Sequence, residues 1–141
     1  MLGAGHRTNV SRETMASIGH DAYRTNAIET ASPEQLTLMC YDGALRFMRR
    51  AAKSLDDGDR ADASYATGRA QAIVNELNIT LDMEAGGDIA TNLRSIYLFV
   101  NRHLSEAISS GEAAKVRESM GLIGDLRGAW AEAMNLGAAA A

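Results

Sequence analysis

The spacing of the residues that break helices constrains the fold most. The chain's one proline lies in the sequence ASPEQ, where Ser32 can cap a helix that has Pro33 at its first position and Gln35 at its third. Apolar residues at helical spacing continue to about residue 55, and turn formers recur at 56–59, 86–88 and 110–111. These breaks predict four helices, over about residues 33–55, 60–83, 89–109 and 112–135.

The lengths of these segments and of their links predict the topology. Each helix is about 30–37 Å long at 1.5 Å per residue, and short links force neighbouring helices to run antiparallel. We therefore expect an all-α fold, an antiparallel up-down four-helix bundle over residues 21–136. Residues 1–20 show no sustained period and are expected to form a disordered N-terminal tail, and residues 137–141 a frayed tail.

Composition excludes several classes of protein. A chain of 141 residues with 46% hydrophobic residues can form a core without a metal or a disulfide. A net charge of -4 argues against nucleic acid as a partner. The chain has no apolar run long enough to span a membrane, and its start lacks the apolar region of a signal peptide. With a single cysteine, Cys40, these features favour a cytoplasmic protein that is not inserted in a membrane.

The residue patterns of enzymes are missing from the sequence. No Glu is followed by His three residues later, which excludes the usual di-iron helical bundle. The sequence contains no phosphate-binding loop, nucleophile elbow or Cys/His cluster, so we expect no enzymatic activity, no cofactor and no metal. One alternative is a histidine phosphotransfer bundle with His103 as the phosphate acceptor. An ordinary half-buried histidine is the simpler interpretation of His103.

The first predicted helix carries two apolar stripes. The core stripe consists of Leu38, Tyr41, Leu45, Met48, Ala52 and Leu55. The second stripe consists of Leu36, Met39, Cys40, Gly43 and Phe47. Its centre lies about 150° from that of the first at 100° per residue, which is too far round to face the same core. Because a four-helix bundle has no outer layer, we expect a lid segment or a partner to cover the second stripe.

The second helix repeats this pattern more weakly. Its core face consists of Ala66, Ala70, Ile73, Leu77 and Leu81. Its second stripe, about 130° away, consists of Tyr65, Ala72, Ile79 and Met83. The third and fourth helices carry one stripe each, formed by Ile89, Leu93, Ile96, Val100, Leu104 and Ala107 and by Val116, Met120, Ile123 and Trp130.

Three arrangements can cover the second stripe of the first helix. Residues 21–31, which carry Tyr23, Ala27 and Ile28, can fold back as a lid, or a partner helix can occupy the same surface. A bundle that acts only as a homodimer would bury the stripe against a second copy. Gly43, in mid-helix, favours a close approach by the lid or the partner.

Three sequence motifs, in order along the chain, resemble one protein family. Residues 22–45 read AYRTNAIETASPEQLTLMCYDGAL, residues 77–93 read LNITLDMEAGGDIATNL, and residues 122–130 read LIGDLRGAW. Together they resemble the FliS family, the flagellin-specific secretion chaperones, over about residues 21–134. The tail before His20 is longer than usual for the family, and Cys40 stands where many members carry Leu.

The resemblance implies a helical bundle with an N-terminal lid segment and a cytoplasmic role in protein export. Such a protein binds the disordered C-terminal region of flagellin, prevents premature polymerisation, and delivers flagellin to a component of the flagellar type III export gate. Without its client it would be a monomer or a weak homodimer. The motifs and the helical wheel together place client binding at Tyr23, Asn26, Ile28, Leu36, Met39, Cys40, Gly43, Phe47, Tyr65, Ala72, Ile79 and Met83.

Overall fold

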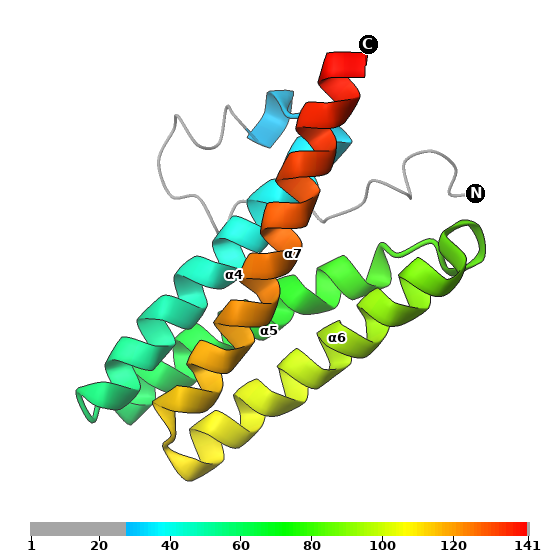
Figure 1. Ribbon diagram of the computed structural model, residues 1–141. Coiled ribbons are helices and arrows are strands. Elements are labelled where there is room, and N and C mark those ends of the chain that lie inside the picture. Colours follow the sequence, from blue (N-terminus) through cyan, green and yellow to red (C-terminus); the bar gives the residue numbers. More distant parts are fainter. Residues whose placement is uncertain (1–27, 141) are drawn as a thin grey trace.

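The computed structural model describes residues 28–140, and their side chains as far as residue 137 (Figure 1). Within this range the long helices are α4 (Pro33–Asp56), α5 (Arg60–Ile79), α6 (Met83–Ser110) and α7 (Ala113–Ala140). Helix α4 packs against α5 and α7, and α6 packs against the same two helices. The described residues therefore form the predicted all-α bundle, and the expected tail of residues 1–20 lies outside them.

The starts of α4 and α5 follow from the capping residues that the sequence contains. The backbone N–H of Gln35 donates to Ser32 Oγ at 3.2 Å, and the N–H of Ser32 donates to Gln35 Oε1 at 2.8 Å. The side chain of Asp59 accepts a hydrogen bond of 3.1 Å from the N–H of Asp62 and caps α5. The predicted starts of both helices are confirmed.

The connection between α5 and α6 differs from the prediction. Helix α5 ends at Ile79, not near residue 83, and Asp82 caps α6 by accepting from the N–H of Ala85 at 2.9 Å. The turn therefore lies at residues 80–82, because Thr80 and Asp82 supply partners for the free backbone groups there. Gly87, at φ 52° and ψ -129°, makes a kink inside α6 instead of the expected turn.

The distal ends of α6 and α7 also test the predicted boundaries. Gly111, at φ 75°, ends α6 as expected. Helix α7 runs to Ala140, five residues beyond its predicted end.

The core contains residues of both predicted stripes of α4. From the core stripe, Tyr41, Met48 and Ala52 are buried, whereas Leu38, Leu45 and Leu55 are half-buried. From the second stripe, Leu36, Cys40, Gly43 and Phe47 are buried and Met39 is half-buried. The expectation that the second stripe cannot face the bundle interior is wrong.

The neighbours of α4 explain this result. Helix α4 packs against both α5 and α7. Helix α6 lies across the interior, where Tyr41 Oη and Tyr97 Oη form a buried hydrogen bond of 2.6 Å. A helix with three neighbours buries a wider arc than a single stripe, so two stripes of α4 can belong to one core.

Most of the core residues predicted for α5, α6 and α7 are buried or half-buried, as expected. Ala66, Ala70, Ile73 and Leu77 of α5, and Val100, Leu104 and Ala107 of α6, are buried. Ile89 is an exception, since it lies near the start of α6 and is exposed, while Leu81 is half-buried in the α5–α6 turn. In α7, Val116 and Ile123 are buried, and Trp130 packs half-buried against the core.

A polar cluster joins α4 to α5 near their connection. The guanidinium of Arg50 forms an ion pair with Asp62, and Ser54 Oγ donates to Asp62 Oδ2 at 2.5 Å. These hydrogen bonds from Arg50 and Ser54 lower the pKa of Asp62 from the usual 3.8 to about 2. Because the folded chain holds this carboxylate ionised, the stabilisation is present above pH 4 and is lost as pH falls toward 2.

We expect Asp62→Asn to remove this part of the acid sensitivity. Urea unfolding at pH 7, 4 and 2.5 should show the parent chain more stable than the variant at pH 7, with the difference shrinking between pH 4 and 2.5. Asp57→Asn is the matched control, because the ion pair of Asp57 within the described residues joins it to the exposed Lys53 of its own helix end. An equal pH dependence in the parent chain and Asp62→Asn would contradict the assignment.

Candidate functional site

Large apolar side chains remain exposed on three of the helices. Among the described residues, these are Tyr65 and Ile79 of α5, Ile89, Leu98 and Phe99 of α6, and Leu136 of α7. Burial of exposed apolar side chains is the main favourable contribution when a second chain binds. These residues therefore mark the surface of the bundle that a partner can cover.

The outer face of α5 carries most of the second stripe predicted for it. Tyr65 is 54% exposed, Ile79 is 72% exposed, and Ala72 between them is also exposed. The guanidinium carbon of Arg50 lies 5.2 Å from the centre of the Tyr65 ring. Met83, the fourth member, is half-buried and begins α6. We call Tyr65, Ala72 and Ile79 the α5 face.

The α4 residues predicted to bind a client lie inside the bundle. Leu36 and Phe47 are each 6% exposed, and Cys40 has no exposed surface. Burial raises the pKa of the Cys40 thiol to about 12, so it stays protonated and unreactive at neutral pH. Ile28 is also buried. A partner can contact these side chains only after another part of the chain has moved.

Two further residues predicted to bind a client precede the described part of the chain. Tyr23 and Asn26 lie outside the described residues, as does most of the expected lid of residues 21–31. The last residues of that segment line a shallow cleft beside the start of α4. This cleft is lined by Thr30, Ala31, Gln35, Leu38 and Met39.

A second cleft lies between the start of α4 and the end of α7. Its volume is about 400 Å³, and Ser32, Gln35, Trp130 and Met134 are among its lining residues. Trp130 Nε1 donates a hydrogen bond of 3.0 Å to the carbonyl oxygen of Glu34 and fixes the indole at the edge of the cleft. Trp130 thus forms part of a surface as well as part of the core.

Helices α6 and α7 are close near the turn that joins them and spread apart toward the start of α6 (Figure 1). Near the turn, His103 Nε2 of α6 lies 2.6 Å from Glu118 Oε1 of α7. Farther from the turn, the residues that precede His103 in α6 and follow Glu118 in α7 at helical spacing are apolar. We call them the α6–α7 strip; they are Leu93, Ile96 and Phe99 of α6 and Leu122 and Leu126 of α7.

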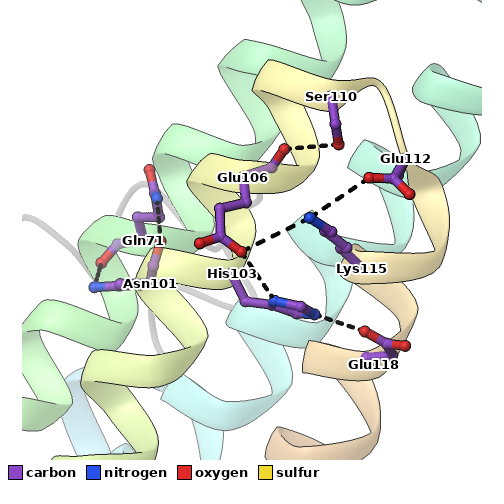
Figure 2. Close-up of polar contacts among 8 residues, drawn as sticks. All are labelled: Gln71, Asn101, His103, Glu106, Ser110, Glu112, Lys115 and Glu118. Atoms are coloured by element: carbon purple, nitrogen blue, oxygen red, sulfur yellow. Dashed lines mark hydrogen bonds and ion pairs between the residues drawn. The ribbon is translucent and has the colours of Figure 1, made fainter.

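The surroundings of His103 are unsuited to a phosphate acceptor. Figure 2 shows His103 between Glu106 of its own helix and Glu118 of α7, and its side chain is 14% exposed. The ring of Phe99 stacks on it at a centroid distance of 4.9 Å. Two carboxylates would repel an incoming phosphoryl group, so the geometry favours the interpretation of His103 as an ordinary half-buried residue.

The described residues lack two other kinds of site. None of the helices in residues 28–140 has the length and apolar character that a membrane span needs. The same part of the chain contains no group of three or more His, Cys, Asp or Glu side chains able to hold a metal ion.

Sequence reasoning missed three exposed apolar residues, Leu98, Phe99 and Leu136. The sequence could have indicated Leu98 and Phe99, because both are apolar and both fall outside the apolar stripe predicted for the third helix, α6. Adjacent apolar residues off the core stripe of a helix are candidates for a binding surface.

Similarity to known proteins extends over most of the chain. A family model described as flagellar protein FliS matches residues 15–137. The flagellar secretion chaperone FliS of Bacillus subtilis is 32% identical over 115 residues, which cover 82% of this chain and 85% of that protein. FliS of Salmonella typhimurium is 38% identical over 106 residues, covering 74% and 78% of the two chains. FliS of Campylobacter jejuni is 33% identical over 119 residues, covering 84% and 93%.

Proposed function

Because this chain belongs to the FliS family, it is a flagellar secretion chaperone and not an enzyme, and we propose that its client is flagellin. In this proposal it binds the disordered C-terminal region of newly made flagellin in the cytoplasm. It prevents premature polymerisation and delivers flagellin to a component of the flagellar type III export apparatus. The expected stoichiometry is one to one.

The single observation that carries the proposal is the exposed apolar surface of the bundle. Tyr65 and Ile79 on the α5 face, together with Leu98 and Phe99 of α6, present large apolar side chains to solvent. An amphipathic client segment gains roughly 25 cal/mol for each Å² of apolar surface that it removes from water there. Holding a client by such contacts needs no ATP.

In the proposal, the client-binding residues fall into two groups. Tyr65, Ala72, Ile79 and Met83 contact the client without any movement of the bundle. The α4 residues belong to the core or its edge, so in the proposal the client contacts them only when the segments that pack over them move; they are Leu36, Met39, Cys40, Gly43 and Phe47. The burial of Ile28 and the cleft beside Met39 support a cover that includes the end of the segment carrying Tyr23 and Asn26. That segment is the proposed lid.

The same exposed residues bear on the state of the chain without a client. Uncovered apolar side chains on α5 and α6 favour weak self-association, so we propose a monomer or a weak homodimer in the absence of flagellin. The client and a second copy would then compete for the same surface.

Filament growth tests the proposal. Flagellin monomers are mixed with short filament seeds, and growth is followed by light scattering with and without an equimolar amount of this chain. We expect the chain to suppress growth without ATP, and a variant carrying both Tyr65→Asp and Ile79→Lys to suppress it much less. Unchanged growth in the presence of the parent chain would contradict the proposal.

A further inference from the structure

One buried hydrogen bond joins the middle of α6 to α4. The hydroxyl oxygens of Tyr41 and Tyr97 lie 2.6 Å apart, and the two side chains are 3% and 2% exposed. Burial raises the pKa of both hydroxyls, so the pair stays neutral at physiological pH. Neither hydroxyl has access to bulk water as a replacement partner in this arrangement.

The part of α6 that precedes Tyr97 is packed more loosely than the part that follows. We call residues 83–96 the α6 arm. Within the arm only Ala90 is buried, whereas Tyr97, Val100, Leu104 and Ala107 are buried in the second half of α6. The arm carries the exposed Ile89 and contributes Leu93 and Ile96 to the α6–α7 strip.

The polar contacts of the arm to other helices, among the described residues, join it to α5. Arg94 Nε donates to Asn78 Oδ1 of α5 at 3.1 Å. Arg94 Nη2 also donates to the carbonyl oxygen of Asn78 at 3.4 Å. The remaining side-chain hydrogen bonds of the arm, among the residues that the structure describes, stay within the helix or its cap. Proceeding along α6, Tyr97 is thus the first residue with a hydrogen bond to α4 or α7. Gly87 kinks the chain inside the arm, near its first residues, and an added Cβ there would meet no atom within 4 Å.

We propose that the Tyr41–Tyr97 pair positions the α6 arm and thereby sets how far α6 and α7 stand apart along the α6–α7 strip. This inference rests on the proposed function, because the segment admitted between α6 and α7 is an apolar part of the client. The pair acts through the arm, and neither tyrosine contacts the client. When the arm moves away from α7, Leu93 and Ile96 gain the exposure that an apolar client segment requires.

The chemistry of a paired hydroxyl predicts a characteristic pattern of mutational effects. Tyr97→Phe leaves the Tyr41 hydroxyl buried without a partner, and that hydroxyl can regain a partner from water only if the arm opens. Tyr41→Phe has the mirror-image effect. Replacing both tyrosines with Phe removes both hydroxyls, so no buried hydroxyl is left without a partner. The arm should then return toward its original position.

Hydrogen exchange measured by mass spectrometry on the full chain without client tests the inference. In either single variant, the amides of the arm should exchange roughly tenfold faster or more. Exchange at residues 103–110 of α6 and at residues 40–52 of α4 should stay near parent values. The double variant should bring the arm back toward the parent rate. Tyr65→Phe is the matched control, since it removes an exposed hydroxyl and should leave the arm unchanged.

Association kinetics with a peptide from the C-terminal region of flagellin, followed by Trp130 fluorescence, connect the arm to the client. If the open arm admits the peptide, both single variants should associate faster than the parent and than the double variant. Faster exchange in all four helices, or a double variant more open than either single variant, would overturn the positioning role. If the exchange pattern appears but no variant binds the peptide, the proposed client is wrong and the positioning role stands.

Discussion

Replacing Phe47 with Asp is expected to unfold most of the chain at ordinary temperatures. The Phe47 side chain is 6% exposed and belongs to the core. Loss of a buried Phe costs about 3–5 kcal/mol, and an unpaired carboxylate in an apolar site adds to that cost. The free energy of unfolding of a domain is only about 5–15 kcal/mol. Circular dichroism melting should show a transition that is strongly lowered or absent.

The matched variant is Tyr65→Asp, which places the same side chain on the exposed α5 face. Tyr65 is 54% exposed, so its replacement should change the melting temperature little. This pair decides whether the second stripe of α4 belongs to the core or to a surface. A folded Phe47→Asp variant with parental melting would show that the burial of this stripe contributes little to stability.

Replacing Ile79 with Lys is expected to weaken flagellin binding at least tenfold without changing the melting curve. Ile79 is 72% exposed at the last residue of α5, where a cation interacts favourably with the helix dipole. Full burial of such a side chain is worth about 1.5–3 kcal/mol, and each 1.4 kcal/mol changes a dissociation constant about tenfold. A charged ammonium group in the same contact would also lose hydration.

Ser109→Lys is the control for Ile79→Lys. Ser109 is exposed in the last turn of α6, so the substitution adds the same charge at an equivalent position of another helix. Titration of both variants with flagellin should show weakened binding only for Ile79→Lys. Equal affinities of Ile79→Lys and the parent chain would remove the end of the α5 face from the client site.

The fold follows from the sequence where a capping residue is unambiguous. Ser32, Pro33 and Gln35 define the start of α4, and Gly111 the end of α6. The turn at residues 80–82 was not predicted, because the pair of glycines that follows it is the stronger helix-breaking signal. One of these glycines does leave helical geometry, but the helix resumes after the kink.

The candidate site could be predicted only in part, because a helical wheel does not count the neighbours of a helix. The second stripe of α5 is mostly exposed, as expected, since its outer side faces no other described helix. The second stripe of α4 is buried in a helix that packs against both α5 and α7 and also contacts α6, where Tyr41 bonds to Tyr97. The separations on the two wheels are similar, at about 150° and 130°, yet the two second stripes have opposite exposures.

The most direct test of the central claim is a calorimetric titration of the purified chain with flagellin from the same genome. Three ligands are compared: full-length flagellin, flagellin lacking its C-terminal region, and a peptide that contains only this region. We expect one-to-one binding of the first and the third with similar affinity and no binding of the truncated protein. Binding of the truncated flagellin with unchanged affinity, or no binding of any of the three, would contradict the account.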